Sequence, residues 1–598
     1  MMTDFFNDPR QLGPRRALRT PLPDGAFTLS HPDPLAPYAR CIGEWLERWA
    51  RETPDATAFA EPAAAGGWIT LTWRTLRQRV GSVAQALLDR RLPASRPIVI
   101  LSDNALDHLV LMLAGMHIGR AVCTVSSGYC RLAQGDFSKI HGILRTLEPA
   151  LIYASDAAVY GAAVEGCGID DALVVFSRGA GPSSLDFAAL LAARETAAVM
   201  AAFDAITPDT HAKYLLTSGS TGTPKVVINT HRMLCANQQM IAQTLRFLEH
   251  DKPVLLDWLP WSHTFGGNHN INMVLRNGGT LYIDDGRPLP GLIDKTLAHL
   301  RDVQPTVYFN VPRGYEMMLP ALEADFELAR RFFGRLKMVF YAGAGMPEAT
   351  WRRLEAVAAT VRDDPVWFTT SWGSTETSPA ITFANWRLDR PGVIGLPMPG
   401  ATVKFVPNGS KLELRVRGDH IFPGYRGNDA ATREAFDDEG YYRIGDAGYL
   451  LDDADPHSGI VFNGRVAEDF KLTSGTWVSV GTLRIKVVTA LSPLAADVVI
   501  TGHDRDQIGV LVFPSEAARQ LPADTLATTL RDALRALKAE GGGSSQVPTR
   551  ALLLSEPPSL AAGEITDKGY LNQRLVLQRR AAEVAALYND ADTRVIRP

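Results

Sequence analysis

The sequence predicts an α/β protein: a large amino-terminal domain of helix-covered sheets that includes a small β-barrel-like subdomain, followed by an α+β carboxyl-terminal domain. Two observations predict this fold class. Short apolar strands alternate with amphipathic helices from about residue 41 to residue 370, which is typical of a largely parallel sheet covered by helices. After Gly392 the strands become short and alternating and are joined by close turns, which indicates a small antiparallel sheet or barrel.

The expected elements divide the chain into three parts. Residues 1–40 are rich in Pro, Arg and Asp and should form an extended arm across the surface. Residues 41–464 form the large domain, with its antiparallel part at about 392–463, and residues 465–598 form the small domain. Expected helices are 42–51, 75–90, 105–117, 232–247 and a basic helix over 572–588. Expected strands are 68–72, 97–101, 120–125, 150–153, 173–176, 254–259, 280–283, 306–310, 338–341, 366–370, 401–406, 412–416, 421–425, 441–446 and 460–462.

Length and composition exclude several classes of protein. A chain of 598 residues exceeds one ordinary core, so about three to four folding units are expected. The net charge of -4 gives no reason to expect a nucleic-acid partner. Five cysteines without metal-type spacing favour reduced thiols. The best apolar run, 109–125, is interrupted by His117 and Arg120, so we expect no membrane association and a cytoplasmic location.

The stretch from Tyr214 to Ile228 is the most informative one. An apolar run enters a loop of glycine and hydroxyl residues before a second apolar run begins, which predicts a strand, a loop and a strand. Glycines let the backbone turn its N–H groups toward one point, and the final lysine adds a cation. The predicted ligand is a polyphosphate, bound by Thr217, Ser218, Gly219, Ser220, Thr221, Gly222 and Lys225. A Gly/Ser surface turn is the alternative; a Walker loop would need Gly-Lys-Ser/Thr leading into a helix.

An aromatic turn follows the expected strand 254–259. It contains Trp261, His263 and Phe265 next to two glycines, at the place where a parallel sheet puts ligand contacts. On its own, His263 is more often a hydrogen-bonded structural histidine.

Two later turns and one strand end carry further candidate groups. The small-residue turn 342–347 would let a planar ligand lie against the backbone. In the turn 371–377, Trp372 can stack on a base, Thr375 can donate to a phosphate and Glu376 can hold a hard cation. Asp446 ends a strand and can accept hydrogen bonds from hydroxyl groups. Each of these could also be an ordinary turn.

Taken in order, these segments resemble the adenylate-forming acyl-CoA synthetase superfamily over nearly the full chain. The motifs are the phosphate loop, the aromatic turn Trp261–Asn268, Ala342-Gly343-Ala344-Gly345, Trp372-Gly373-Ser374-Thr375-Glu376, Leu414–Gly418, Tyr442-Arg443-Ile444-Gly445-Asp446, Gly464-Arg465 and Gly563–Tyr570. Within this superfamily, the residue sequences of the segments 261–268, 467–471 and 564–570 look most like those of the feruloyl-CoA synthase group.

The resemblance implies a two-step ligase that uses ATP, Mg2+ and coenzyme A. A carboxylate would attack the α-phosphate of ATP to give an acyl-adenylate, and the thiol of coenzyme A would then displace AMP. It also implies a mobile carboxyl-terminal domain that presents its lysine to only one of the two steps. The implied site residues are Lys568, His263, Thr375 and Glu376 for catalysis, Glu376 for the metal, and Trp372, Ala344, Gly345, Asp446 and Arg465 for the nucleotide.

Three departures from the family pattern leave details open. Ala467 stands where a polar hinge residue is common, so the pivot could instead be Glu468 or Asp469. Trp372 replaces the usual tyrosine but keeps a stacking surface. The segment 475–486 lacks the usual acidic ending of its motif, which leaves the coenzyme A contacts undetermined.

The substrate remains the least determined part of the interpretation. We expect an aromatic acid such as ferulate or a related hydroxycinnamate in a flat pocket formed by Trp261, His263, Phe265, Val311, Tyr341 and Gly343. Such residues are more often plain core. The alternatives are another aromatic or fatty acid, transfer of the acyl group to a carrier-protein thiol, or a nucleotide-binding protein without catalysis.

Overall fold

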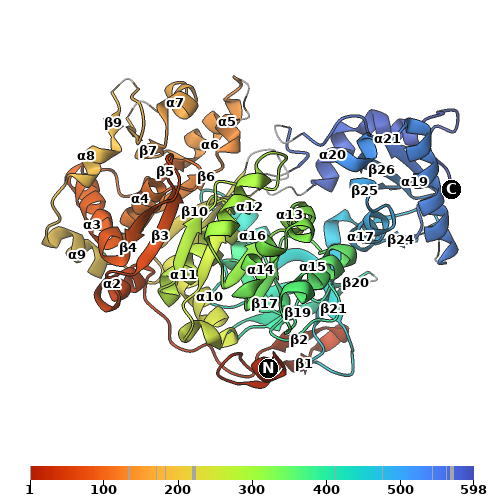
Figure 1. Ribbon diagram of the computed structural model, residues 1–598, viewed down its shortest axis with the longest axis horizontal. Coiled ribbons are helices and arrows are strands. Elements are labelled where there is room, and N and C mark those ends of the chain that lie inside the picture. The colour runs from red at the N-terminus through yellow and green to blue at the C-terminus, as the bar shows by residue number, and fades with distance from the viewer. Residues whose placement is uncertain are drawn as a thin grey trace.

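The computed structural model describes residues 2–131, 133, 135–169, 171–181, 183–217, 224–409, 411–474, 476–541, 543, 545–559, 562–565 and 571–598. The α/β fold class is confirmed. Figure 1 shows a large body, coloured red to cyan, with the carboxyl-terminal unit in blue at one end. The amino terminus lies beneath the large body, beside β1 and β2.

The first sheet of the large body has seven strands in the order β11-β10-β6-β5-β7-β8-β9. All neighbours are parallel except β10 and β11, which form an antiparallel hairpin. Strands buried on both faces read as continuous apolar runs, which is why the sequence revealed them. The strands and flanking helices are α2 Gly43–Glu52, α3 Trp73–Asp89, β5 Ile98–Leu101, α4 Leu106–His117, β6 Val122–Val125, α5 Gly128–Arg131, α6 Ser138–Leu147, β7 Leu151–Ala154, α7 Ala157–Glu165, β8 Leu173–Phe176, β9 Leu185–Asp186, α8 Phe187–Leu191, α9 Ala197–Asp204, β10 His211–Thr217, β11 Lys225–Thr230 and α10 His231–Thr244.

Two further sheets, in the orders β12-β13-β3-β4 and β14-β15-β16-β17-β18, are parallel except at β3–β4, β16–β17 and β17–β18, which pair antiparallel. Strand β3 was not predicted, because its Ala-Phe-Ala-Glu-Pro sequence has little β-branched or aromatic content. The elements are β3 Thr57–Pro62, β4 Trp68–Thr72, β12 Val254–Asp257, the π-helical turn η3 Phe265–Asn270, α11 Ile271–Asn277, β13 Thr280–Ile283, α12 Ile293–Asp302, β14 Val307–Asn310, α13 Pro312–Ala324, α14 Phe326–Gly334, β15 Met338–Tyr341, α15 Glu348–Val361, β16 Phe368–Gly373, the 3-10 turn η4 Thr375–Thr377, β17 Ala380–Phe383 and β18 Leu396–Pro397.

The antiparallel sheet corrects two predictions. Its order is β1-β2-β19-β20-β21-β22, so the amino-terminal arm is not merely extended across the surface: it supplies two strands, and β2 pairs with β19. The expected strand 421–425 is absent, because Pro423 and Gly424 interrupt it and only an isolated bridge joins Tyr425 to Val227. The bounds are α1 Met2–Asn7, β1 Leu18–Pro21, β2 Phe27–Ser30, β19 Thr402–Asn408, β20 Lys411–Arg417, α16 Asp429–Ala435, β21 Tyr442–Leu450 and β22 Ile460–Arg465.

The carboxyl-terminal unit has its own hydrophobic clusters, formed only by residues after 469. The basic helix expected over 572–588 is two helices, which separate at Arg580, where the backbone leaves helical geometry (φ -96°, ψ 31°); its guanidinium donates to the buried Glu564 carboxylate at 2.9 and 3.0 Å. The elements are β23 Phe470–Lys471, β24 Trp477–Val478, α17 Val480–Ala490, β25 Ala495–Thr501, β26 Gly509–Pro514, α18 Glu516–Arg519, α19 Ala523–Ala539, β27 Arg550–Leu553, α20 Gln573–Arg579 and α21 Ala581–Leu587.

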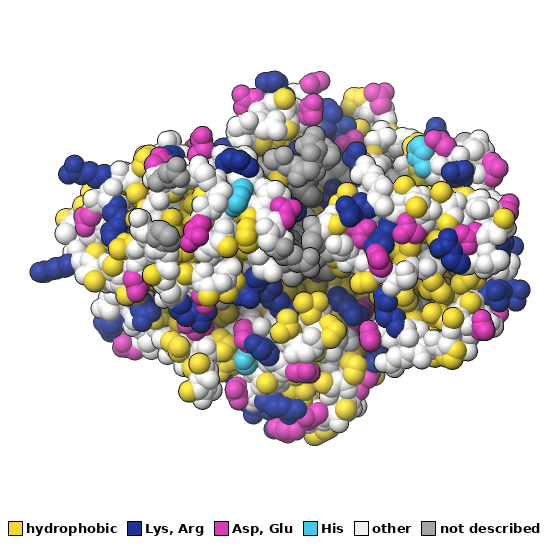
Figure 2. Space-filling model, turned by 90° about the horizontal axis from the view of Figure 1, so that it is seen from above, with side chains coloured by type: hydrophobic (Ala, Val, Ile, Leu, Met, Phe, Trp, Pro, Cys, Tyr) yellow, Lys and Arg dark blue, Asp and Glu magenta, His cyan; other side chains and the backbone are white. Residues whose placement is uncertain are grey.

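On the face shown in Figure 2, basic and acidic side chains are interspersed and form no large patch of a single charge. This mixture agrees with the small net charge of -4. In the part of the chain that the structure describes, no helix combines the length and the apolar character that crossing a bilayer requires.

Candidate active site

A cavity of about 1050 Å³ lies where the large body meets the carboxyl-terminal unit. Its walls come from the ends of β10, β15 and β16, from the antiparallel strands β21 and β22, and from Gly563, Ile565 and Asn572. The structure brings many of the predicted site residues to this one cavity: Thr217, Lys225, His263, Phe265, Tyr341, Gly343, Ala344, Gly345, Trp372, Thr375, Glu376, Asp446 and Arg465.

Six predicted residues lie outside the described residues: Ser218, Gly219, Ser220, Thr221, Gly222 and Lys568. Their described neighbours do reach the cavity. Thr217 and Lys225 pair across the β10–β11 hairpin and both line the cavity, and so do Ile565 and Asn572 in the carboxyl-terminal unit.

Two residues of the predicted acid pocket are core residues instead. Trp261 and Val311 are fully buried and do not line the cavity. The Trp261 ring packs edge-on against His108, with the ring centroids 5.1 Å apart. Val311 directly precedes α13, where its N–H donates to Asn310 Oδ1 at 2.8 Å. A turn exposes only some of its residues to a cavity, and spacing within a turn does not tell which.

One end of the cavity is built around Asp446. The buried Trp372 indole donates from Nε1 to Asp446 Oδ2 at 2.8 Å, and Arg465 Nε lies 3.2 Å from Oδ1. Asp446 and Arg465 face each other because β21 and β22 pair in that register. Burial raises the pKa of Asp446, although the Arg465 charge and the indole N–H both oppose the shift. The carboxylate is therefore held ready to accept hydrogen bonds at the cavity wall.

The small-residue turn after β15 lies beside this end. Gly343 has a φ of 88°, a conformation that glycine adopts without strain. A Cβ on Gly345 would lie 3.1 Å from the Ile485 side chain of α17, so the carboxyl-terminal unit packs directly onto the turn. A planar group can approach the backbone here.

Tyr425 connects two predicted residues and was missed from the sequence. Its hydroxyl donates to Glu376 Oε1 at 3.1 Å, and Lys225 Nζ lies 4.7 Å from the centre of its ring. Burial and the Glu376 charge raise the pKa of Tyr425, so it remains a neutral donor. Because Tyr425 reaches β11 through long-range pairing, no local pattern could have identified it.

Glu376 is the cavity carboxylate best suited to a hard cation. It is 7% exposed, its neighbour Thr375 also lines the cavity, and no Lys or Arg among the described residues forms an ion pair with it. Carboxylate oxygens are ligands that Mg2+ prefers. A second acidic group, Asp284 with Asp285 and His299, is engaged in its own contacts: Asp284 accepts from Thr296 and from the Gly286 N–H.

Part of the cavity wall is apolar and aromatic. Phe265, Phe340 and Tyr341 line it, together with His269, which the sequence analysis did not single out. His263 lines the cavity as well, and its carbonyl accepts from the Gly267 N–H at 2.7 Å. The only signal for His269 was its place four residues after Phe265 in the aromatic turn.

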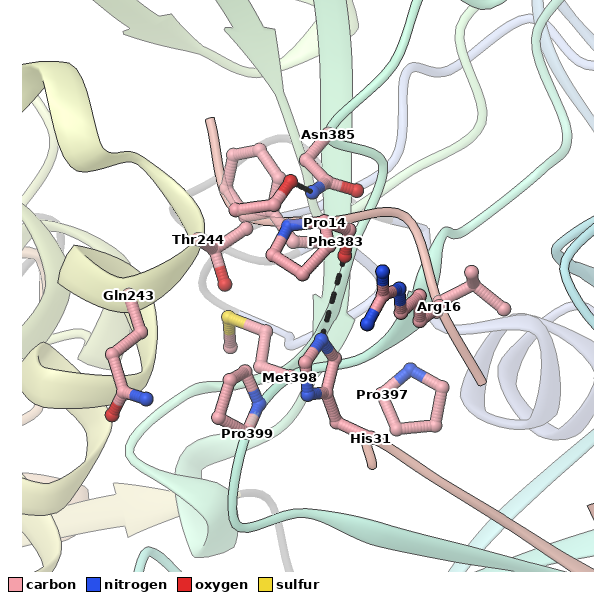
Figure 3. Close-up of a pocket in the computed structure, with 12 residues that line it drawn as sticks. Pro14, Arg16, His31, Gln243, Thr244, Phe383, Asn385, Pro397, Met398 and Pro399 are labelled. Carbon is pink, nitrogen blue, oxygen red and sulfur yellow. Dashed lines mark hydrogen bonds between the residues drawn. The ribbon is translucent and has the colours of Figure 1, made fainter. Parts of the chain in front are cut away.

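A second cavity lies beneath the amino-terminal arm, beside β17, β18 and α10 (Figure 3). Asn385 donates to the Gly13 carbonyl there at 2.8 Å, and the His31 ring lies 3.4 Å from the Pro14 carbonyl. Its volume of about 10 Å³ is that of a single water, so it is a packing gap under the arm and not a substrate site.

Residues 46–426 match the family model of the AMP-binding enzyme, and residues 474–592 match that of the AMP-binding enzyme C-terminal domain. The chain belongs to the AMP-binding enzyme family. One curated relative is a carboxylic acid reductase of Mycobacterium tuberculosis. It is 25% identical to this chain over 549 residues, which are 83% of this chain and 44% of that protein. A 3-[(3aS,4S,7aS)-7a-methyl-1,5-dioxo-octahydro-1H-inden-4-yl]propanoyl:CoA ligase of Rhodococcus jostii is 25% identical over 425 residues, 68% of this chain and 76% of that protein.

The chain spans less than half the length of several of these relatives, including 38% of a probable acyl-activating enzyme of Arabidopsis thaliana. Solved structures show the same fold. An anthranilate CoA ligase in complex with anthranoyl-AMP superposes with a TM-score of 0.73 at 18% identity, covering 92% of this chain and 99% of that one. ATP-bound MatB from Rhodopseudomonas palustris gives 0.68 at 20% identity, covering 91% and 99%.

Proposed function

We propose that this AMP-binding enzyme is an acid–thiol ligase that activates an aromatic carboxylic acid with ATP and transfers it to coenzyme A. The observation that carries the proposal is the joint cavity. The ends of the phosphate-loop hairpin, the Glu376 carboxylate, the Asp446 acceptor and the carboxyl-terminal segments flanking Lys568 all line this cavity, together with apolar aromatic side chains.

The first step joins the acid to AMP. A carboxylate oxygen attacks the α-phosphorus of ATP, the bond to the β-phosphate oxygen breaks, and pyrophosphate leaves. Lys225 and the loop from Thr217 would hold the departing phosphates, and Thr375 would donate to the α-phosphate. Magnesium on Glu376 would stabilise the charge that develops on the phosphate oxygens. Lys568 would supply a positive charge between the carboxylate and the α-phosphate.

The nucleotide is held at the opposite end from the ring of the acid. Asp446 would accept from the ribose hydroxyls and Arg465 would donate to the ribose. The turn at Ala344 and Gly345 and the face of Trp372 would flank the adenine. His263 would lie near the reacting carboxylate.

In the second step the thiol of coenzyme A attacks the acyl carbon, AMP leaves, and the thiol proton is released. We infer that the carboxyl-terminal unit changes its pose between the steps, so that Lys568 serves only the first. We infer that the acid is ferulate or a related hydroxycinnamate. The aromatic cavity residues Phe265, Phe340 and Tyr341 support this inference, as does the resemblance of segments 261–268, 467–471 and 564–570 to the feruloyl-CoA synthase group.

Pyrophosphate release tests the proposal directly. The purified protein, with ATP and magnesium, should release pyrophosphate with ferulate and form the thioester only when coenzyme A is added. Glu376→Gln should lower turnover by orders of magnitude while ferulate still binds. The ferulate assignment fails if acetate or a long-chain fatty acid gives a higher kcat/KM. Thioester formation on an acyl carrier protein but not on coenzyme A would favour the carrier-protein function, the activity named for a long-chain-fatty-acid ligase relative of Arabidopsis thaliana.

A further inference from the structure

Lys411, the first residue of β20, forms an ion pair with Asp469 across the boundary between the large body and the carboxyl-terminal unit. Both side chains are largely buried, with 9% of the lysine and 7% of the aspartate exposed. The Lys411 ammonium also donates to the Asn463 carbonyl at 2.6 Å. Neither member of the pair lines the cavity, so direct contact with a nucleotide or an acid does not explain it.

The Asp469 carboxylate is bound to α17, which lies where the carboxyl-terminal unit meets the large body (Figure 1). The N–H of Val480, the first residue of α17, donates to Asp469 Oδ1 at 3.1 Å. Ile485 of the same helix reaches the turn after β15, where a Cβ on Gly345 would lie 3.1 Å from its side chain. The ion pair therefore holds the helix that packs on this turn.

The start of α17 makes two more contacts at this boundary. The Thr482 hydroxyl donates to Asn463 Oδ1 at 3.2 Å, and a Cβ on Gly481 would lie 2.7 Å from Gly464 Cα. Both contacts are neutral. Among the described residues, Lys411 and Asp469 form the only ion pair that joins the chain before residue 466 to the chain after it.

These contacts limit where the unit can turn. Arg465 belongs to the large body because it pairs with Asp446 across β21 and β22, whereas Asp469 belongs to the unit because it is bound to Val480. A rotation of the unit has to take place between Arg465 and Asp469. Since Val480 and Ile485 share one helix, a rotation that lifts Ile485 from its turn also reorients the carboxylate and separates it from its lysine partner.

We propose that Lys411 is a positioning residue for the first step. Its ion pair with Asp469 holds the carboxyl-terminal unit in the pose in which the segments flanking Lys568 line the cavity, and the pair separates before the second step. Removing one partner of a buried pair leaves the other charge buried without compensation. This penalty applies only to the docked pose, because rotation exposes the remaining charge to water. The inference rests on the proposed function and adds the contact that sets the balance between its two poses.

Limited proteolysis measures the docking without reference to activity. Lys411→Met and Asp469→Asn should each be cleaved between residues 465 and 471 about 10- to 100-fold faster than the unmodified protein, because the charge left behind favours the undocked pose. Asparagine keeps an acceptor for the Val480 N–H. The double variant Lys411→Met/Asp469→Asn buries no charge at this place, so its cleavage rate should return close to that of the unmodified protein.

Lys404→Met is the matched control. The Lys404 side chain on β19 is also 9% exposed and forms ion pairs with Asp437 and Glu439, but all three residues lie within the large body. The variant removes a lysine of the same burial without touching the boundary. Its cleavage between residues 465 and 471 should not change.

The two half-reactions supply a second readout. With ferulate, ATP and magnesium, Lys411→Met should form the adenylate more slowly, by up to about 100-fold, because less of the protein is in the docked pose. Thioester formation from prepared feruloyl-adenylate and coenzyme A should be at least as fast as in the unmodified protein. A residue that serves only the stability of the fold would slow both half-reactions together.

The outcomes separate the two proposals. If the unmodified protein forms no adenylate with any aromatic acid, the proposed function is wrong and the role of Lys411 falls with it. If the adenylate forms but Lys411→Met is cleaved at the unmodified rate, or slows both half-reactions equally, the proposed function stands and the role of Lys411 is refuted. Faster cleavage that Lys404→Met shares, or that the double variant does not reverse, would refute it too.

Discussion

The hydrogen bond between Trp372 and Asp446 makes a quantitative prediction about nucleotide binding. Trp372→Phe keeps an aromatic face at the cavity wall but removes the N–H that donates to Asp446 Oδ2 at 2.8 Å. Both side chains are buried, so water does not readily replace the lost donor. A hydrogen bond to a charged group contributes about 1.5–3 kcal/mol. The bond is also present without nucleotide, so the affinity for AMP falls only by the part of this energy that reordering the carboxylate costs, at most about 10- to 150-fold.

The pH dependence of binding should change as well. The indole N–H lowers the pKa of Asp446 against the effect of burial, so its removal should raise that pKa further. An acid with a raised pKa binds its proton more tightly in the folded state, and its ionisation therefore costs stability as the pH rises through the raised pKa. In the proposed role of Asp446, nucleotide binding needs the ionised acceptor, so the loss of affinity on acidification should begin at a higher pH in the variant.

Calorimetric titration with AMP at a series of pH values measures both effects. Trp73→Phe is the control: Trp73 is fully buried in α3, and its Nε1 has no partner among the described residues. That variant should bind AMP as the unmodified protein does. Binding within two-fold of the unmodified protein at every pH in Trp372→Phe would refute the role of the hydrogen bond.

Two further predictions follow. Gly481→Ala should weaken the docking of the carboxyl-terminal unit on the large body by about 1–3 kcal/mol, because the new Cβ would lie 2.7 Å from Gly464 Cα. Limited proteolysis after residue 465 should therefore become faster, and an unchanged cleavage rate would contradict this prediction. Lys213 is buried and donates to the Gly267 carbonyl at 2.6 Å, and burial lowers its pKa to about 7 from 10.5. Because the folded state holds the Lys213 proton less tightly than the unfolded state, the buried charge destabilises the fold fully below pH 7 and progressively less between about pH 7 and 10.5. The free energy of unfolding, measured by urea titration, should rise with pH in that window, and Lys213→Met should lack this rise.

Several of the predicted site residues lie together in one cavity, whereas the edges of the fold were not predicted. Thr217 and Lys225 were recognised because a glycine-rich loop between two apolar runs leaves few interpretations, and both line the cavity. The pairing of β2 with β19 joins segments more than 370 residues apart, for which the local pattern of either strand has no signal. The arm was therefore predicted as a surface segment.

The errors within the site have a different cause. Periodicity tells which side of a strand or helix is buried, but not which side chains of an irregular turn face a cavity. For this reason Trp261 was assigned to the pocket while it packs on His108, and His269, from the same turn, was overlooked while it lines the cavity. Tyr425 was missed because its contacts with Lys225 and Glu376 depend on how three distant segments meet.

The aromatic residues of the cavity and the Trp372–Asp446 pair come from different elements, and this has a consequence for the test of Trp372. His269 and Phe265 come from η3, whereas Trp372 lies on β16 and Asp446 on β21. No hydrogen bond or ring contact between described residues joins the imidazole to the Trp372–Asp446 pair. Substitutions at sites without shared partners have additive effects, so the double variant His269→Leu/Trp372→Phe should lose affinity for AMP by the same factor as Trp372→Phe alone. In the proposed function, an acid pocket built by η3 and a nucleotide pocket built by β16 and β21 can therefore change independently of each other.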